Sequence, residues 1–416
     1  MSTDRTAQVL TLLLAGGEGH RLRPLTEHRA KPAVPFGGSY RILDFTLSNC
    51  INSNFRRICV LTQYESLTLH RHLRSAWNIL SPQLGEFIDI LPPQQRLPNR
   101  WYLGTADAVF QNLHLLQQER PRWVLIVGGD HIYKMDYGRL LAAHLDNEAS
   151  ASVVCIDVPL EAAGSFGVAQ ADPTDRIVDF QEKPRRPSPM PGSPERALAS
   201  MGVYLFDTEV LVRALIRDAR TEGSSHDFGR DLLPRLIHEC PVFAYRFNSP
   251  EQPGSPYWRD VGTIDSYWHA NMDLLMPRPE FDLYDHSWPI HGSLGNGPPA
   301  KVCASADGVM GVVEQSLIAP GTTVSGGRVR RCVIGPRVTV HGGSELEECV
   351  LMAEVVIGTD VRLKRVIIEE RARIPDGTTF GGDLGFDAEK FKVTEGGILT
   401  VPRRPPLKQP EVSLVK

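Results

Sequence analysis

The chain has 416 residues, of which 42% are hydrophobic and 23% are charged, and its formal net charge is −4. This length exceeds what one hydrophobic core usually organises, so we expect two domains. The hydrophobic fraction excludes a largely disordered chain. The small net charge gives no overall field that would recruit nucleic acid or an anionic membrane, so we expect small-molecule partners.

The N-terminal residues and the cysteines indicate a cytoplasmic protein. The first apolar run, residues 9–15, is too short to span a bilayer, and no signal-peptide pattern precedes it. The seven cysteines include no CxxC pair, which argues against a disulfide framework and against a structural zinc site. Cys59 and Cys155 lie in apolar runs, so we expect them to be small buried hydrophobic residues.

The first two thirds of the chain alternate short apolar runs with helical patterns, which is typical of an α/β fold with a mostly parallel sheet. Apolar residues near i, i+3 and i+4 spacing predict helices over 137–145, 208–217 and 230–238. Five prolines between 184 and 194 predict a surface loop. The predicted strands cover residues 9–14, 57–62, 123–127, 151–158, 176–180, 202–206 and 242–247.

A different pattern begins near residue 280. Residues 276–300 are rich in Pro, Gly and aromatics, which predicts an interdomain connector. Similar strings then start at Ile318, Ile334, Ile357 and Ile374, which are 16, 23 and 17 residues apart. Three hexapeptides make a solenoid coil of about eighteen residues, so the spacing predicts a small β-helix with one inserted loop. A β-sandwich is the weaker alternative, because four copies are few.

The turn after the first predicted strand is rich in small residues, namely Ala15, Gly16, Gly17 and Gly19. Its backbone N–H groups could cradle phosphates, although it is neither a P-loop nor a dinucleotide fingerprint. A purely structural turn would explain the glycines equally well. The next residues carry four cations, Arg21, Arg23, Arg29 and Lys31. This cationic density suits a triphosphate, so phosphate binding is the better interpretation.

Two aspartates are candidate metal ligands. Asp130 ends an apolar strand, at the carboxyl edge where open α/β sheets bind their ligands. Magnesium prefers oxygen and usually takes one or two protein carboxylates, so Asp260 is the candidate for the second. Asp260 also has a structural explanation, as the N-cap of a helix that starts near Thr263. Lys183, after another predicted strand, could likewise be a solvated charge before a turn.

Taken together, these motifs resemble those of bacterial ADP-glucose pyrophosphorylases, or glucose-1-phosphate adenylyltransferases. The strings SNCINS, HDFG and YWRDVGT carry the resemblance most specifically, and AGGEGHRL, WYLGTADAV, VGGDHIYKMDY and FQEKP add to it. The resemblance covers essentially the whole chain. It implies a Rossmann-like nucleotidyltransferase domain over 1–280, a connector over 281–300, and a left-handed β-helix of hexapeptide repeats with a C-terminal tail over 301–416.

The resemblance also implies a reaction. ATP and α-D-glucose 1-phosphate would give ADP-glucose and diphosphate for glycogen-type glucan synthesis, with Mg²⁺ held by Asp130 and Asp260. Lys183 would contact the phosphate of glucose 1-phosphate, and Arg21 and Lys31 would contact the triphosphate. The implied ATP-site residues are Ala15, Gly16, Gly17, Gly19, Arg21, Lys31, Tyr102, Gly104 and Thr105. The implied glucose-1-phosphate residues are Tyr102, Gly167, Glu182, Lys183, Ser200, Asp227, Phe228 and Trp258.

Members of this family are allosteric homotetramers, so we expect a phosphorylated sugar activator and a nucleotide inhibitor. Arg29 and Arg41 match residues of the effector site. His28 and Pro35 stand where some relatives carry Lys and His, so the effectors cannot be named. Leu103 replaces an arginine of the ATP-site segment.

Three alternatives have different consequences. A regulatory subunit without activity would tend to lose the carboxylates and the lysine, which are present here. An enzyme that makes UDP- or dTDP-glucose would share the glycine loop but not SNCINS, HDFG and YWRDVGT. A hexapeptide acyltransferase would need a base, and the repeat region offers only His341.

Overall fold

The computed structural model describes residues 5–93, 101–247, 256–293, 297–382 and 391–403. The chain divides by its internal contacts into two compact units, Met1–Gly17 with Phe45–Trp258 and Glu18–Asp44 with Arg259–Lys416. Residues 294–296 of the expected connector and the C-terminal tail from 404 lie outside the described residues. The expected domain boundaries near 280 and 300 follow the sequence motifs instead of these contacts, and they stay a prediction.

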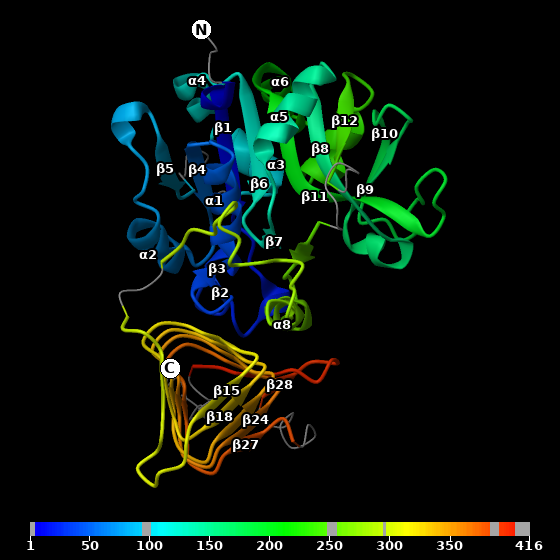
Figure 1. Ribbon diagram of the computed structural model, residues 1–416. Coiled ribbons are helices and arrows are strands. Elements are labelled where there is room, and N and C mark those ends of the chain that lie inside the picture. Colours follow the sequence, from blue (N-terminus) through cyan, green and yellow to red (C-terminus); the bar gives the residue numbers. More distant parts are fainter. Residues whose placement is uncertain (1–4, 94–100, 248–255, 294–296, 383–390, 404–416) are drawn as a thin grey trace, which may run out of the picture. The chain divides into compact units, whose positions relative to one another are not determined.

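The first unit is built on a nine-stranded sheet with the order β10-β9-β11-β6-β1-β4-β5, in which β8 pairs with β11 and β12 (Figure 1). The pairs β1–β4, β1–β6, β4–β5 and β8–β12 are parallel, whereas β11 runs antiparallel to β6, β8 and β9. The strands are β1 (Val9–Ala15), β4 (Arg57–Thr62), β5 (Phe87–Leu91), β6 (Trp123–Gly128), β8 (Ala151–Pro159), β9 (Gly167–Ala171), β10 (Ile177–Glu182), β11 (Arg196–Asp207) and β12 (Val242–Arg246).

Every strand expected from the sequence is present, which confirms the α/β class. The continuous apolar runs gave the clearest signal because β1 and β6 are buried along nearly their whole length. Cys59 and Cys155 are buried, as expected, and burial raises the pKa of the Cys59 thiol to about 12. These two cysteines therefore act as packing residues.

The helices of the first unit agree with the expected ones, with one difference. The expected helices 137–145 and 208–217 are α5 and α6, and the expected loop over 184–194 contains neither helix nor strand. The expected helix 230–238 begins two residues earlier as a π-helical turn, Phe228–Leu232, and continues as α7. The helices are α1 (Ile42–Asn52), α2 (Ser66–Ala76), α3 (Thr105–Phe110), α4 (Leu113–Glu119), α5 (Tyr137–Asp146), α6 (Thr208–Ala219) and α7 (Leu233–Leu236).

The repeat region of the second unit forms three stacks of short parallel strands, the left-handed β-helix that the sequence predicts. The first stack is β14 (Lys301–Cys303), β17 (Thr323–Ser325), β20 (Thr339–Val340), β23 (Val356–Ile357) and β26 (Arg373–Ile374). The second is β15 (Val312–Glu314), β18 (Arg328–Arg330), β21 (Glu345–Glu347), β24 (Arg362–Lys364) and β27 (Thr379–Phe380). The third is β16 (Leu317–Ile318), β19 (Val333–Ile334), β22 (Val350–Leu351), β25 (Val366–Ile368) and β29 (Leu399–Val401), with β28 (Lys392–Val393) antiparallel at its end.

The prediction of an inserted loop between Ile334 and Ile357 is wrong. Ile318 pairs with Ile334 and Ile334 with Leu351 in the third stack, whereas Ile357 pairs with Ile374 in the first. The longer interval therefore contains one whole coil and one further hexapeptide, which moves the motif to another side of the β-helix. The aliphatic side chains point into one shared core, including Ile334, Leu351 and Ile357.

The second unit also contains short elements from the N-terminal third of the chain. They are β2 (Pro35–Phe36), β3 (Tyr40–Arg41) and two 3₁₀ turns, His20–Leu22 and Lys31–Ala33. Helix α8 (Ile264–Asp273) follows the strand β13 (Trp258–Asp260), and β7 (His131–Tyr133) belongs to the first unit.

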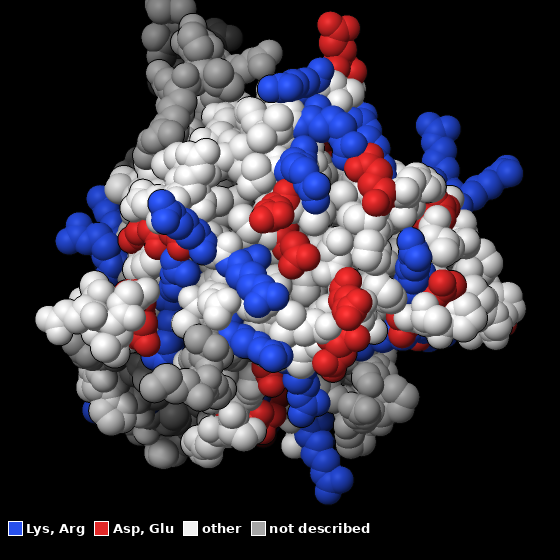
Figure 2. Space-filling model, turned by 90° about the horizontal axis from the view of Figure 1, so that it is seen from above, with Lys and Arg blue, Asp and Glu red and all other residues white. Residues whose placement is uncertain are grey.

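Surface charge does not locate a site on the face drawn in Figure 2. Lys and Arg side chains are interspersed there with Asp and Glu side chains. Among the described helices, none is both long enough and apolar enough to cross a membrane.

Candidate functional site

The carboxyl ends of β1 and β6 bring two predicted motifs together in the first unit. Leu14 pairs with Gly128, and the Gly129 N–H donates to the Leu14 carbonyl at 3.1 Å. The chain therefore leaves β6 toward Asp130 directly beside the point where β1 leads into Gly16 and Gly17. This is the sheet edge at which α/β folds bind their ligands.

Helix α1 fixes the segment around Asp130 through its polar side chains. Thr46 Oγ1 donates to the Gly128 carbonyl at 3.1 Å. Asn49 donates to the Tyr133 carbonyl at 3.0 Å and accepts from the Met135 N–H at 3.1 Å. Asn49 is fully buried, so both bonds are protected from water. Asn49, the first asparagine of the string SNCINS, therefore holds the backbone that follows Asp130.

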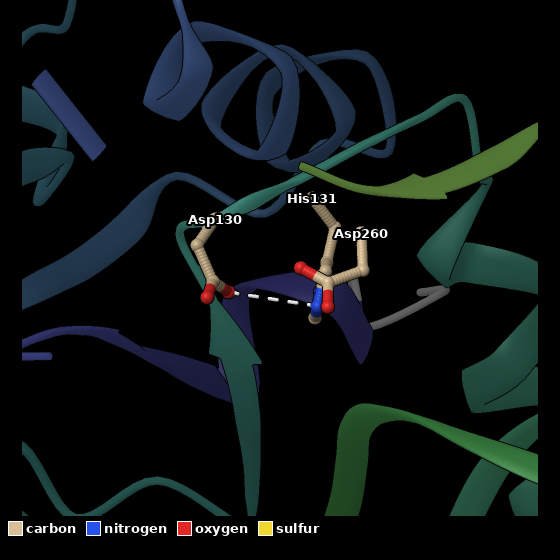
Figure 3. Close-up of side chains that lie close together, drawn as sticks. All are labelled: Asp130, His131 and Asp260. Carbon is tan, nitrogen blue, oxygen red and sulfur yellow. Dashed lines mark ion pairs between the residues drawn. The ribbon is translucent and has the colours of Figure 1, made fainter. Parts of the chain in front are cut away.

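Asp130 lies beside a histidine and an aromatic pair. Asp130 Oδ1 is 3.7 Å from His131 Nε2 (Figure 3), and the His131 ring is 5.2 Å from the Trp258 ring, which in turn lies 5.2 Å from the Phe166 ring. Asp260, the third side chain in Figure 3, belongs to the second unit. Each of the three labelled residues offers one ligand atom that a metal accepts. The convergence of Asp130 and Asp260 on one ion joins residues of the two units, and it stays a prediction.

In the second unit, Asp260 lies with two of the predicted phosphate-binding cations. Lys31 Nζ is 3.1 Å from Asp260 Oδ1, and Lys31 is only 7% exposed. A Cβ atom on Gly262 would lie 2.9 Å from Asp260 Oδ1 and 3.0 Å from Arg21 Nη2. Gly262 therefore leaves room for the carboxylate and the guanidinium on either side of it.

The alternative explanation of Asp260 as a helix N-cap is wrong. Helix α8 is capped by Thr263, whose side chain accepts from the Ser266 N–H in a reciprocal capping box. Asp260 precedes this cap by three residues and contributes no bond to it. Its ion pair with Lys31 is the contact that explains its position.

The glycine turn has a structural component in addition to any ligand role. Gly19 has a φ of 66°, and a Cβ there would lie 3.0 Å from Thr26 Cγ2. Thr26 Oγ1 donates to the Gly19 carbonyl at 2.8 Å. A non-glycine residue would be strained at Gly19, so this glycine is required by the turn itself. By contrast, a Cβ on Gly17 would meet nothing within 4 Å.

The predicted sugar-phosphate residues gather at the end of β10. Lys183 Nζ is 3.1 Å from Glu182 Oε1, and the Lys183 side chain is 60% exposed. Lys183 has a φ of 47°, an uncommon conformation for a residue with a side chain, and it is stabilised by its N–H donating to the Phe166 carbonyl at 3.0 Å. The side chain of Lys183 is therefore accessible, while its backbone is held in an uncommon conformation.

The Glu182 carboxylate passes between two glycines. A Cβ on Gly167 would lie 2.8 Å from Glu182 Oε2, and a Cβ on Gly229 would lie 2.3 Å from the same atom. Gly167 is thus explained by the protein's own side chains, whatever else approaches it. Gly229 was not singled out from the sequence, although it is the last letter of HDFG.

Asp227 and Thr105, predicted for different substrates, contact each other. Thr105 Oγ1 donates to Asp227 Oδ2 at 3.0 Å, and the Phe228 N–H donates to Thr105 Oγ1 at 3.1 Å. Asp227 Oδ1 accepts from the N–H groups of Gly229 and Arg230 at 2.9 and 3.0 Å, which caps the π-helical turn. A π-helical turn of this kind is typical of functional sites.

The other predicted side chains are largely buried. Phe228 is 1% exposed and stacks on Tyr204, with ring centroids 5.6 Å apart, so its side chain belongs to the core. Ser200 accepts from the Gly202 N–H at 3.2 Å, where the pairing of β11 with β8 shifts register. The Tyr102 hydroxyl accepts from Asn112 at 3.0 Å, and burial raises the Tyr102 pKa.

The two predicted effector cations are neutralised by carboxylates of the β-helix. Arg29, 7% exposed, has Nη2 at 3.6 Å from Glu369 and at 3.5 Å from Glu370, and Arg41 Nη2 is 3.4 Å from Glu370. Arg41 also donates to the Ala33 carbonyl. Sequence reasoning missed both glutamates because, in the sequence, they look like two solvated charges at the end of a repeat.

Comparisons with known proteins cover nearly all of the chain. A family model described as nucleotidyl transferase matches residues 10–276, and one described as GlmU-like, C-terminal hexapeptide matches residues 298–401. The chain is 50% identical over 399 residues to a glucose-1-phosphate adenylyltransferase of Methylobacillus flagellatus, which covers 95% of this chain and 93% of that protein. It is 48% identical to a protein of the same name from Methylococcus capsulatus, over 95% of this chain and 93% of that protein. It is also 48% identical to one from Dechloromonas aromatica, over 95% of this chain and 91% of that protein.

Gly104 provides a test of the packing between the segment that starts α3 and the HDFG segment. A Cβ there would lie 2.3 and 2.4 Å from the carbonyl oxygens of His226 and Ser225, while its φ of −163° is open to any residue. We expect Gly104→Ala to lower the free energy of unfolding by about 1–3 kcal/mol, as overpacking does. The control is Gly382→Ala, whose Cβ would lie 3.7 Å from its nearest neighbour, and calorimetry measures the unfolding temperature of both variants. Equal unfolding temperatures for the two variants would contradict this packing.

Proposed function

Because this chain belongs to the glucose-1-phosphate adenylyltransferase family, we propose that it transfers the adenylyl group of ATP to α-D-glucose 1-phosphate, giving ADP-glucose and diphosphate for glycogen-type glucan synthesis. The observation that carries the proposal is 50% identity to a protein of that name over 95% of this chain. This identity extends through both matched family models, and it favours the same pair of substrates.

The proposed chemistry is a direct in-line displacement. A phosphate oxygen of glucose 1-phosphate attacks the α-phosphorus of ATP, and a new P–O bond forms. The bond from that phosphorus to the bridging oxygen breaks, and its electron pair leaves with pyrophosphate. No covalent intermediate with the protein is needed, so the protein contributes positioning and charge.

We assign the cations to the anionic groups that they can reach. Arg21 and Lys31 bind the triphosphate, and their shared position beside Asp260 supports this assignment. Lys183 binds the phosphate of glucose 1-phosphate, which its exposed side chain on a strained residue supports. The remaining ATP contacts are Ala15, Gly16, Gly17, Gly19, Tyr102, Gly104 and Thr105. The remaining sugar contacts are Tyr102, Gly167, Glu182, Ser200, Asp227, Phe228 and Trp258.

Enzymes of the nucleotidyl transferase family generally use a divalent metal, and we propose Mg²⁺ here. Asp130 and Asp260 supply carboxylate oxygens, the ligands that Mg²⁺ prefers, so the donor set fits this ion. When bound, Mg²⁺ would neutralise charge on the phosphates. Lys31 pairs with the Asp260 carboxylate and thereby limits the repulsion between that carboxylate and the incoming triphosphate.

We further propose the setting in which the enzyme works. The seven cysteines are free, which fits a cytoplasmic protein. The domains are those that the sequence motifs predict, 1–280 for catalysis, 281–300 as a connector and 301–416 as the β-helix domain, which serves assembly into a homotetramer and regulation. The regulators are a phosphorylated sugar that activates and a nucleotide that inhibits, and Arg29 and Arg41 bind their phosphate groups.

Pyrophosphate release by the purified chain tests the reaction. With glucose 1-phosphate and Mg²⁺, we expect release with ATP to exceed release with UTP, dTTP or GTP by at least about a hundredfold, the discrimination that a site built to hydrogen-bond one base can supply. Preference for UTP or dTTP would replace the substrate and keep the site. No release with any nucleotide, with or without sugar phosphates, would favour a regulatory subunit.

Asp130→Ala tests the metal assignment. We expect turnover to fall by about a hundred- to a thousandfold, the usual effect of removing one charge-stabilising group from the transition state. Asp136→Ala is the matched control from the segment after β7, because Asp136 caps α5 by accepting from the Gly138 N–H and pairs with Arg139 on the same helix. Its turnover should stay near that of the unmodified enzyme. Unchanged turnover in a folded Asp130→Ala protein would remove Asp130 from the mechanism.

Glu370→Gln tests the proposed effector site. The substitution removes the carboxylate that Arg29 and Arg41 share, so an anionic activator no longer competes with it. We expect the half-activating concentration of fructose 6-phosphate or fructose 1,6-bisphosphate to fall about fivefold, consistent with losing a partly exposed ion pair. Glu347→Gln is the control, since Glu347 also pairs with two cations, Arg330 and Lys364, on the outer side of the β-helix. An equal response in both variants would argue against the site.

A further inference from the structure

Asp218 is a buried carboxylate that none of the predicted roles uses. It lies near the end of α6 and is 4% exposed. Asp218 Oδ1 accepts from Ser224 Oγ at 2.7 Å, and Asp218 Oδ2 is 2.8 Å from His226 Nδ1. Because a buried charge is costly unless it is paired and hydrogen-bonded, this carboxylate requires both partners to stay in place.

His226, the partner of Asp218, adopts a strained backbone conformation. Its φ is 55°, in the left-handed region that a residue with a side chain rarely adopts. The His226 N–H donates to Ser224 Oγ at 3.0 Å, so Ser224 joins the histidine backbone to the same carboxylate. The anchored imidazole is what stabilises this conformation against relaxation.

The strained conformation turns the His226 carbonyl toward the first turn of α3. That carbonyl accepts from the Ala106 N–H at 2.8 Å and the Asp107 N–H at 3.4 Å. On the other side, Asp227 caps the π-helical turn and accepts from Thr105 Oγ1. Residues 225–229 are therefore bonded to the segment assigned to ATP, and they include the start of the turn assigned to the sugar.

We propose that Asp218 is a positioning residue for both substrates at once. By fixing the His226 imidazole, it sets the geometry of residues 104–107 and of residues 227–229 through one strained peptide. The proposal rests on the proposed function, because that function assigns the two segments to ATP and glucose 1-phosphate. Asp218 itself touches neither substrate.

Steady-state kinetics of the full-length enzyme test this proposal. Asp218→Ala should raise KM for ATP and KM for glucose 1-phosphate together, each about tenfold, the effect of losing one hydrogen bond to a buried charge. The Asp218→Asn enzyme keeps an oxygen that can accept from His226, so both KM values should stay within about threefold of the original. A rise in only one KM, or a fall in kcat alone, would overturn the shared positioning role.

A matched control separates positioning from loss of stability. His144 on α5 is also a buried histidine, 2.9 Å from Ser152 and 3.6 Å from Asp207, and it lies away from both segments. His144→Ala should lower the thermal midpoint and leave both KM values unchanged. If Asp218→Ala lowers the midpoint equally and also leaves both KM values unchanged, Asp218 is only structural and the proposal fails.

Hydrogen exchange gives a readout that does not depend on turnover. In ligand-free Asp218→Ala, the amides of Ala106 and of Gly229 should both exchange faster than in the unmodified protein, whereas His144→Ala should leave them unchanged. Unchanged protection at either amide would overturn the positioning claim. If both amides exchange faster in Asp218→Ala but the unmodified enzyme releases no pyrophosphate with ATP, the positioning role holds and the proposed function is contradicted.

Discussion

The parallel pairing of β1 with β4 and β6 is the constraint on which the site depends. Parallel strands end at the same edge of a sheet, so the chain leaves β1 toward Gly16 and leaves β6 toward Asp130 at adjacent points. The strands are buried nearly throughout, and a shift by one residue would turn every side chain of a strand to the opposite face and disrupt its packing. The apolar core thus fixes the register, and the register places the glycine turn after β1 beside the segment that carries Asp130.

The segments beyond the strand ends need a different kind of support, because irregular backbone must find partners for its N–H and carbonyl groups. Asn49 supplies two such bonds to the segment after Asp130. Asp227 supplies two to the π-helical turn, and the His226 carbonyl supplies two to the start of α3. These polar contacts hold irregular chain in one defined conformation, with His226 as a strained residue among them.

The sequence alone predicts seven of the nine strands of the large sheet, the α/β class and the β-helix, because each depends on a local and repeated apolar pattern. It fails where the meaning of a residue depends on a distant partner. Gly229 looks like any turn glycine until the Glu182 carboxylate is placed against it, and Glu370 looks solvated until two arginines surround it. The repeats show the same limit, since Ile334 and Ile357 match in sequence but belong to different stacks.

Arg29 and Lys31 are separated only by Ala30, and both are nearly buried, so each needs its own carboxylates. Lys31 pairs with Asp260, while Arg29 pairs with Glu369 and Glu370. An anion that removed Arg29 would leave Glu369 buried without its cation, although burial already raises the Glu369 pKa. The pair Arg41 and Glu370 has no such penalty, because each side chain is about one quarter exposed and Arg41 keeps the Ala33 carbonyl. A ligand anion that opened this pair would change the charge around Arg29, and the backbone through Ala30 connects that change to Lys31.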